Sequence, residues 1–274
     1  MNQIQNNIAP PVALTIAGFD PSGGAGVIAD IKTFSAFGFF ATAAVTSLTF
    51  QNTIGVSGAT HQTGATVRSQ ILPVVEDFEI ACVKTGMLPS REVIEEIARL
   101  FRDIKTLPAP VVDPVVRSTS GFDLIDDAAL EALIENLFPL ARLITPNIPE
   151  AERITGLKIE DEGGMIQAAH SLRDMGARAA LVKGGHLTGA PVDVLLDDKN
   201  SVRVFHGARL ISTATHGTGC TLAAAIACGL GRKLSLVDSI ERAKNFVTEA
   251  IRTAPRLGHG HSPVNHFAAV TSNK

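Results

Sequence analysis

The chain has 274 residues, of which 45% are hydrophobic and 19% are charged, and its formal net charge at neutral pH is −3. This composition predicts an ordered globular protein and excludes a disordered chain. The small negative charge and the absence of Trp and Tyr argue against a nucleic-acid partner, because proteins that bind nucleic acids present basic and often aromatic surfaces.

Cysteine content and the N-terminus indicate the cellular compartment. The three cysteines, Cys82, Cys220 and Cys228, show no Cys-x-x-Cys spacing, so we expect no disulfide framework and a reducing environment. Residues 1–11 are polar, contain no Lys or Arg and lack the features of a secretory signal. No apolar run reaches membrane-spanning length. We therefore predict a cytoplasmic protein with no membrane partner.

The order of the predicted elements is typical of an α/β fold with a mostly parallel sheet, because short apolar runs alternate with amphipathic stretches. No linker divides the chain, which favours a flexible segment at 1–11 followed by a single domain at 12–274. Strands are predicted at residues 12–17, 42–49, 80–84, 111–113, 143–145 and 180–183. Helices are predicted at 26–37, 63–75, 91–103, 127–138, 149–155, 163–175, 220–230 and 236–253. A hairpin of residues 191–196 and 201–205, with a turn at 197–200, interrupts the alternation once.

Polar or glycine-rich clusters follow every predicted parallel strand. In open α/β sheets, ligands bind beyond the carboxyl ends of the strands, so these clusters are the candidate site. They occupy residues 18–26, 51–53, 84–87, 113–116, 145–150 and 183–186.

A further cluster, residues 216–224, joins a turn with two glycines directly to a strongly helical run. The first N–H groups of a helix lack intrahelical partners and carry partial positive charge, so this construction favours an anion site. A thiol at that position, here Cys220, is biased toward the thiolate. Taken alone, the same residues are equally compatible with an ordinary joint between a loop and a helix.

The clusters AGFDPSGGAG, ADIKTF, QNT, KTGML, DPV, TPNIPE, KGGH and HGTGCT, in this order, resemble the hydroxymethylpyrimidine and hydroxymethylpyrimidine-phosphate kinases of thiamine biosynthesis. The resemblance runs from about residue 13 to residue 267. It implies the ribokinase-like fold, a three-layer α/β/α sandwich around a mostly parallel sheet. It also implies ATP and Mg²⁺ as cofactors, a homodimer, and phosphorylation of 4-amino-5-hydroxymethyl-2-methylpyrimidine and of its monophosphate.

The substrate side of the predicted site centres on Gln51. A carboxamide can accept from an exocyclic amine and donate to the adjacent ring nitrogen, which is how Asn and Gln recognise adenine. A 4-aminopyrimidine offers the same edge, and the family places its pyrimidine-binding Gln at this position. The resemblance also places Ala25, Asp30, Met87 and Val115 around the substrate. Helix-entry packing for Ala25, core packing for Met87 and solvent exposure for Asp30 are the alternatives.

The phosphate side of the predicted site lies at the helix entry. By resemblance, the backbone N–H groups of Gly217, Thr218, Gly219 and Cys220 form the anion hole for the transferred phosphoryl group. Cys220 stands where the wider fold has an Asp general base. A helix N-terminus can lower a thiol pKa from about 8.5 toward neutrality, so Cys220 either takes a proton or only shapes the hole.

Four further residues complete the predicted phosphate and metal groups. Lys183 resembles the lysine that contacts the triphosphate, and Asn147, beside Asp113 and Glu150, is a further predicted phosphate-binding residue. Asp113 and Glu150 are the expected magnesium ligands, and Mg²⁺ commonly takes only one or two carboxylates. For Glu150, the alternative is a first-turn acid favoured by the helix dipole. His259, His261 and His266 lack the spacing of a metal site and predict a surface loop.

Three other functions are compatible with parts of the pattern. A pyridoxal or pyridoxine kinase shares the glycine-rich site, but Gln51 favours an aminopyrimidine because pyridoxal has no amine next to a ring nitrogen. A catalytically silent pyrimidine sensor has no need of Lys183, Glu150 and the anion hole. A nicotinamide-dependent oxidoreductase is disfavoured because the G-x-G-x-x-G fingerprint is absent.

Overall fold

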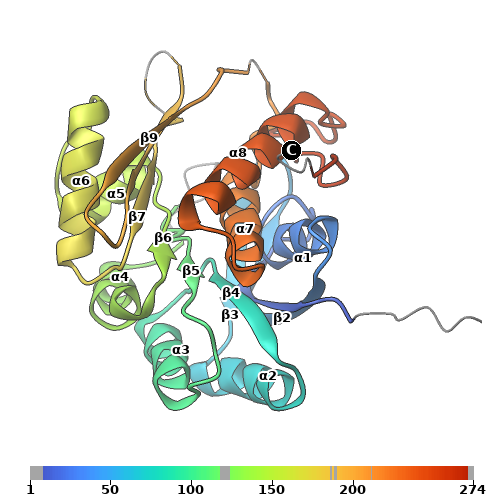
Figure 1. The fold of residues 1–274 in the computed structure, drawn as a ribbon. Coiled ribbons are helices and arrows are strands. Elements are labelled where there is room, and N and C mark those ends of the chain that lie inside the picture. Colours follow the sequence, from blue (N-terminus) through green and yellow to red (C-terminus); the bar gives the residue numbers. More distant parts are fainter. Residues whose placement is uncertain (1–8, 118–123, 186, 188–189, 211, 271–274) are drawn as a thin grey trace, which may run out of the picture.

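A computed structural model describes residues 9–117, 124–185, 187, 190–210 and 212–270, and within them the strands form one nine-stranded sheet (Figure 1). Its spatial order is β3-β2-β1-β4-β5-β6-β7-β8-β9. The strands are β1 (Val12–Phe19), β2 (Phe40–Gln51), β3 (Val56–His61), β4 (Ile80–Thr85), β5 (Val111–Val112), β6 (Leu143–Ile144), β7 (Ala180–Lys183), β8 (Val192–Leu196) and β9 (Val202–His206). Residues 1–8 of the predicted flexible segment lie outside the described residues.

The centre of the sheet is parallel. Strands β2, β1, β4, β5, β6 and β7 run in one direction, so their carboxyl ends meet at one edge of the sheet. The predicted hairpin is confirmed as β8 and β9, which pair antiparallel next to β7. Strand β3, which pairs antiparallel with β2, was not predicted. It is an edge strand with no fully buried residue and without the apolar run that marks the inner strands.

Helices cover both faces of the sheet, which confirms the three-layer α/β/α sandwich. Alternate residues of one strand point to opposite faces, so Ala13 belongs to one apolar cluster and Leu14 to the other. Figure 1 shows α1 (Gly26–Ala36), α7 (Thr218–Gly231) and α8 (Leu236–Arg252) together on one side. The other face carries α2 (Gly64–Asp77), α3 (Arg91–Asp103), α4 (Asp127–Ala132), α5 (Ile148–Thr155) and α6 (Glu162–Asp174).

The helix predicted at 127–138 is shorter and less regular than expected. It is α-helical only to Ala132, then continues as the π-helix η1 (Leu133–Leu137) and the 3₁₀ turn η2 (Phe138–Leu140). Pro139 has no N–H to donate to a further helical turn, which accounts for the tight end. None of the described helices is long and apolar enough to span a bilayer.

The helix starts fall into two groups, and the difference positions the site. Side-chain oxygens cap α2, α3, α4, α5, α6 and α8 and thereby satisfy a backbone N–H of the first turn. No side-chain cap is present at α1, which begins after Ala25, or at α7, which begins after Gly217. At the entry to α1, Asp20 accepts from the N–H groups of Gly24 and Ala25 instead. At α7, the N–H groups of Gly219 and Cys220 keep no acceptor among the described residues.

Candidate active site

The entry to α7 is built by a glycine that no other residue can replace without strain. Gly217 has a φ of 78°, and a Cβ added there would lie 1.8 Å from the carbonyl oxygen of Gly24. The turn before α7 therefore packs directly on the backbone of the loop before α1. The Thr221 hydroxyl donates to the Gly217 carbonyl at 2.8 Å, and the Thr218 N–H donates to the Thr215 carbonyl at 3.4 Å. The N–H groups of Gly219 and Cys220 have no acceptor among the described residues.

A cation from the end of β7 faces this helix entry. The Lys183 Nζ donates to Asp113 Oδ1 at 3.0 Å, and the Thr145 hydroxyl donates to the same oxygen at 3.0 Å. A Cβ added at Gly219 would lie 3.2 Å from Lys183 Nζ and 3.7 Å from Asp113 Oδ2. The structure thus brings together three residues of the predicted site that are far apart in the sequence.

Neighbouring charges keep both Lys183 and Asp113 ionised although both are buried. Burial alone would lower the pKa of Lys183, but Asp113 and Glu150 raise it above its ordinary value. Burial opposes ionisation of Asp113, yet Lys183 and Lys84 hold the pKa of that carboxyl below its usual range. An ammonium group therefore points at the free end of α7, where an anion would bind.

Glu150 serves as a helix cap, which confirms its predicted position in the first turn. Asn147 and Glu150 form a capping box at the start of α5, with N–H to oxygen distances of 2.8 and 2.9 Å. Burial raises the pKa of Glu150 to about 7, Lys183 opposes the shift and Asp113 adds to it. Glu150 therefore shares its electrostatic environment with Lys183 and Asp113, although its geometry is that of a cap.

The residues present are compatible with a magnesium ion that depends partly on substrate oxygens. Among the described residues, no three His, Cys, Asp or Glu side chains gather into a metal-binding cluster. Asp113 nevertheless lies close enough to Glu150 to help raise the pKa of that carboxyl. A pair of carboxylates matches the usual Mg²⁺ site, in which phosphates and water supply the remaining ligands.

The expectation for the ionisation of Cys220 was wrong. Burial, together with Asp30 and Asp113, raises the pKa of the thiol to about 11, although Lys84 opposes the shift. Partial burial of the thiol and the nearby carboxylates both disfavour a thiolate and so oppose the effect expected of the helix N-terminus. At neutral pH Cys220 is a thiol and not a thiolate.

Asp30 does not line the substrate site as predicted. Its carboxylate is fully buried and accepts from Lys84 Nζ at 2.8 Å and from the Thr15 hydroxyl at 2.6 Å. The alternative of a solvent-exposed Asp30 is equally wrong. Lys84, also fully buried, lies under Gly86, where an added Cβ would come within 2.7 Å of its Nζ. The pair forms a charged layer beneath the site.

The other predicted substrate residues divide into accessible and packed ones. Ala25, Gln51 and Val115 are half-buried and lie at the ends of the parallel strands or at the start of α1. Met87 is buried, and its Sδ would lie 3.0 Å from a Cβ added at Gly18. Its geometry is that of a packing residue, as the alternative anticipated.

Similarity to known proteins identifies the family to which this chain belongs. A profile of phosphomethylpyrimidine kinase matches residues 20–265, nearly the whole chain. The chain belongs to the phosphomethylpyrimidine kinase family. It is therefore a phosphotransferase, and the family that the sequence motifs resembled is confirmed.

Curated relatives of this family are similar over most of the chain. The thiamine biosynthesis bifunctional protein ThiED of Geobacter sulfurreducens is 49% identical over 257 residues, which cover 93% of this chain and 52% of that protein. The chain thus spans about half the length of that relative. The hydroxymethylpyrimidine/phosphomethylpyrimidine kinase of Streptomyces coelicolor is 43% identical, and the match covers 94% of this chain and 95% of the relative.

Solved structures confirm the fold but do not separate two kinases of the superfamily. The phosphomethylpyrimidine kinase of Clostridium difficile has a TM-score of 0.78 at 41% identity, covering 88% of this chain and 99% of its own. The pyridoxal kinase of Bacillus subtilis, solved as an ADP complex, has a TM-score of 0.86 at 33% identity, covering 95% and 98%. Pyridoxal kinase from Staphylococcus aureus, in complex with AMP-PCP and pyridoxal, has a TM-score of 0.85 at 30% identity, covering 95% of each chain. Identity is higher to the pyrimidine kinases.

Two residues in the loops of the candidate site, Asp20 and His216, had no role in the sequence-based prediction. His216 Nε2 lies 2.7 Å from Asp20 Oδ2. This contact links the loop before α1 to the turn before α7. The sequence signal was only that Asp20 belongs to the first motif and His216 to the last, since the two residues are 196 positions apart.

The C-terminal histidines differ from one another. His259 and His261 are exposed, as predicted for a surface loop, whereas His266 is buried. His266 Nε2 lies 3.1 Å from the Thr221 hydroxyl, which itself donates to the Gly217 carbonyl. Since that hydroxyl has one proton, His266 donates to it. His266 therefore supports the first turn of α7 from behind.

His266 predicts a pH dependence of stability. Burial and Lys32 lower its pKa to about 4 in the folded protein, against about 6.5 when unfolded. Between these values only the unfolded state binds the proton, so stability falls as the pH is lowered. We expect the wild type to lose about 2 kcal/mol from this source between about pH 7 and pH 5. Urea unfolding of the wild type and of His266→Gln at both pH values tests this loss. The difference between the two proteins isolates the contribution of His266, because Glu150, whose raised pKa gives the opposite pH dependence, contributes equally to both. Equal pH dependence in the two proteins would contradict the assignment.

Cys220 predicts slow alkylation at neutral pH. Because its raised pKa leaves little thiolate, iodoacetamide should modify Cys220 at least tenfold more slowly than a free cysteine at about pH 8. The rate should still be rising above about pH 9. Peptide mass spectrometry separates Cys220 from the buried Cys82 and Cys228. A rate that levels off near neutral pH would show that the thiol is activated after all.

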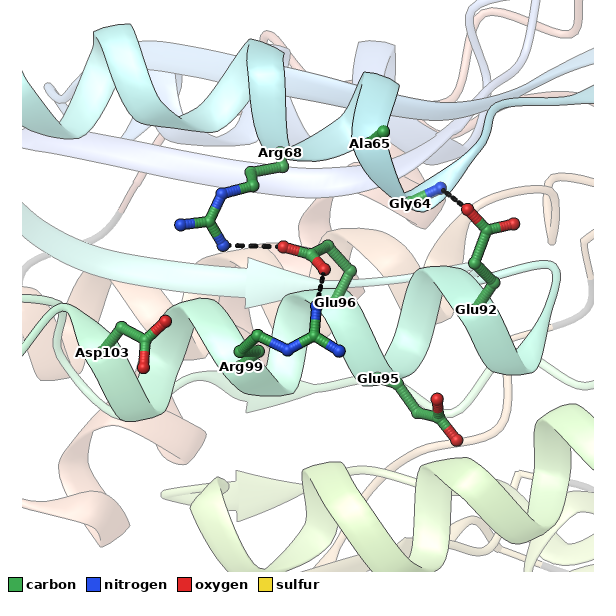
Figure 2. Close-up of a pocket in the computed structure, with 8 residues that line it drawn as sticks. All are labelled: Gly64, Ala65, Arg68, Glu92, Glu95, Glu96, Arg99 and Asp103. Carbon is green, nitrogen blue, oxygen red and sulfur yellow. Dashed lines mark hydrogen bonds and ion pairs between the residues drawn. The ribbon is translucent and has the colours of Figure 1, made fainter.

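A hollow of about 550 Å³ lies between α2 and α3 and shares no residue with the candidate site (Figure 2). Some of its charges are paired within the hollow, whereas Glu95 pairs with Arg91 outside it. Glu96 lies between Arg68 and Arg99, with a distance of 2.7 Å to Arg68, and Glu92 accepts from the backbone N–H of Gly64 at 2.8 Å. These contacts hold α2 against α3, and we assign this hollow a structural role.

Proposed function

We propose that this protein transfers the γ-phosphoryl group of ATP to the hydroxymethyl group of 4-amino-5-hydroxymethyl-2-methylpyrimidine, and then a second phosphoryl group to the monophosphate. The observation that carries the proposal is the Lys183 ammonium group held over the uncapped first turn of α7. Family membership and the names of relatives that cover most of the chain support the choice of substrate.

The catalytic roles follow from charge and position. Phosphoryl transfer needs little covalent help from the protein, so catalysis consists mainly of positioning and of neutralising the phosphoryl oxygens. The N–H groups of Gly219 and Cys220 are available as donors, the Thr218 N–H would first have to leave the Thr215 carbonyl, and Lys183 supplies the positive charge. Asp113 holds Lys183 in place, and the Asn147–Glu150 cap fixes the neighbouring helix.

Magnesium fits the carboxylate side of this arrangement. Asp113 and Glu150 are the residues that would hold it, directly or through water. When bound, Mg²⁺ neutralises charge on the oxygens of the β- and γ-phosphates. The Asp113 carboxylate is itself held in a fixed position by hydrogen bonds from Lys183 and Thr145.

Gln51 distinguishes the two candidate substrates. An aminopyrimidine offers an amine beside a ring nitrogen, which matches the acceptor and donor of one carboxamide. Pyridoxal offers no such pair. Ala25 and Val115 are half-buried, and we propose that they contact the ring.

The deciding experiment measures ATP-dependent turnover of hydroxymethylpyrimidine, its phosphate and pyridoxal side by side, with products identified by mass. We expect both pyrimidines to be phosphorylated with kcat/KM at least tenfold above that for pyridoxal. A preference for pyridoxal would replace the proposal with the second kinase. Pyrimidine binding without any ATP consumption would instead indicate a sensor.

Cys220 enters this proposal as a neutral thiol that shapes the anion hole. Cys220→Ala is expected to slow the first and second phosphorylation by similar factors, because a thiol with a pKa of about 11 is a poor proton acceptor at neutral pH. Single-turnover assays with each substrate measure the two steps separately. A general base would matter only when the neutral hydroxymethyl group attacks. Selective loss of the first step would therefore restore the role of base.

We also propose a homodimer in the cytoplasm. Leu48 and Phe50 on β2 and Ile54 in the adjoining turn are exposed large hydrophobic residues, which supports self-association through this part of the molecule. Light scattering of the purified protein tests the oligomeric state.

A further inference from the structure

Asp193 is a buried acidic residue to which the proposed mechanism gives no role. It lies on β8, is 7% exposed, and pairs in antiparallel register with Lys183, the last residue of β7. Lys183 is the cation of the proposed site, so Asp193 lies directly beside the active site. A charged group buried at such a point needs partners, and these partners indicate its role.

The two oxygens of the Asp193 side chain have different partners. Oδ1 accepts from the backbone N–H of Gly184 at 3.0 Å. Oδ2 forms an ion pair with the ammonium group of Lys244, which lies on α8. Asp193 thus connects the residue that follows Lys183 to the helix layer that also contains α7 (Figure 1).

The Gly184 N–H lies where the pairing of β7 with β8 ends. Lys183 and Asp193 are the last paired residues at this end of β7, and beyond them the Asp193 side chain accepts from the chain. The two backbones are in close contact here, because a Cβ added at Gly184 would lie 2.0 Å from the Val192 carbonyl oxygen. Asp193 therefore fixes the direction in which the chain leaves β7.

The backbone of Lys183 is also held from the opposite side. Its N–H donates to the Pro146 carbonyl at 2.8 Å, and Asn147 pairs with it as an isolated parallel bridge. Lys183 is thus held between the segment before α5 and the Asp193 side chain. Since the backbone conformation limits which side-chain rotamers are allowed, these contacts limit where the Lys183 ammonium group can lie.

We propose that Asp193 is a positioning residue that directs Lys183 toward the transferred phosphoryl group by fixing the Gly184 N–H. The inference rests on the proposed function. The Lys183 Nζ donates to Asp113 and lies 3.2 Å from a Cβ added at Gly219, so a small shift of its backbone would move it away from the entry of α7. Asp193 itself contacts neither the substrate nor the reacting atoms, and its effect on catalysis passes through the lysine.

Two double variants separate the acceptor from the charge. Asp193→Asn/Lys244→Met removes both charges of the ion pair and keeps an oxygen that accepts from the Gly184 N–H. Asp193→Leu/Lys244→Met removes the same charges with a side chain of similar shape, but it lacks the acceptor. Because a displacement of about 1 Å in an active site can cost about a hundredfold in rate, we expect the kcat of the Leu variant to be about 10- to 100-fold below that of the Asn variant. The KM for the pyrimidine should agree within about threefold, because the lysine acts on the transition state.

A cycle with Lys183→Met tests whether Asp193 acts through the lysine. In the Lys183→Met background the Asn and Leu variants should have equal kcat, because no ammonium group remains to be positioned. Equal kcat values in the presence of Lys183, or the same kcat ratio in both backgrounds, would overturn the inference and indicate a structural role. A wild type that phosphorylates neither pyrimidine would instead refute the proposed function.

The Asn variant provides a second measurement if the Leu variant fails to fold. Hydrogen exchange of the Gly184 amide, followed by NMR, reports on its hydrogen bond. We expect similar protection of this amide in the wild type and in Asp193→Asn/Lys244→Met, with kcat values that agree within about threefold because the lysine keeps its position. An unprotected Gly184 amide in the wild type would contradict the inference. So would a kcat at least about tenfold lower in the Asn variant while the amide stays protected.

Discussion

Lys183→Met is expected to lower kcat by about 10²–10³-fold, the range found when one preorganised charge-stabilising group is removed from an active site. Lys183 is the cation that faces the uncapped entry of α7, as its 3.2 Å distance from a Cβ added at Gly219 shows. The positive charge of Lys183 is needed most in the transition state, where it neutralises negative charge on the transferred phosphoryl group. The loss should therefore appear mainly in kcat, with a smaller change in the KM for the pyrimidine.

The measurement is steady-state kinetics of both phosphorylation steps, with circular dichroism to show that the variant is folded. Lys158→Met is the matched control, because Lys158 is a strongly exposed lysine whose partner is Glu160. We expect the control to retain full activity. A loss of less than about tenfold in Lys183→Met would show that the backbone donors of α7 stabilise the transferred group without this lysine.

Lys84→Met is expected to destabilise the folded protein by about 3–5 kcal/mol, because it leaves a buried carboxylate without its counter-ion. Lys84 and Asp30 both have no exposed side-chain surface, and their charged atoms lie 2.8 Å apart. Burial lowers the pKa of Lys84, but Asp30 more than reverses this effect, so the lysine stays charged. The only other hydrogen-bond donor that the described structure gives to the Asp30 side chain is the Thr15 hydroxyl.

Urea unfolding measures this loss of stability. The control is Asp30→Asn/Lys84→Met, which removes both charges and keeps an acceptor for Thr15. Because replacing a buried ion pair as a unit costs much less than breaking it, the double variant should regain at least half of the lost free energy. A double variant no more stable than Lys84→Met would show that packing of the lysine chain, and not its charge, is what Asp30 requires.

Much of the fold was predictable because its signals are local. The buried inner strands appear as continuous apolar runs, and β7 begins and ends where the sequence predicted. The α7 entry was equally readable, because a two-glycine turn before an apolar helix is a local pattern. Strand β3 escaped because an exposed edge strand carries no apolar run and owes its structure to its pairing with β2.

The ionisation of the site depended on three-dimensional neighbours. The helix dipole near Cys220 was predictable from the adjacent residues, but the carboxylates of Asp30 and Asp113 that oppose it come from other elements. Asp30 itself illustrates the same limit. Its partner Lys84 is 54 residues away in the sequence. The spacing of apolar residues in α1 does not indicate that the helix face carrying Asp30 is fully buried.

The sequence by itself determined the α/β alternation, the family and the identity of the residues at the strand ends, because these depend on short patterns and on their order. Tertiary structure alone decided which polar groups neutralise one another. It joined Asp20 to His216 across 196 positions and placed Lys183 over α7. Burial and charge pairing depend on distances in space, and the parallel sheet sets those distances by gathering the ends of six strands at one edge.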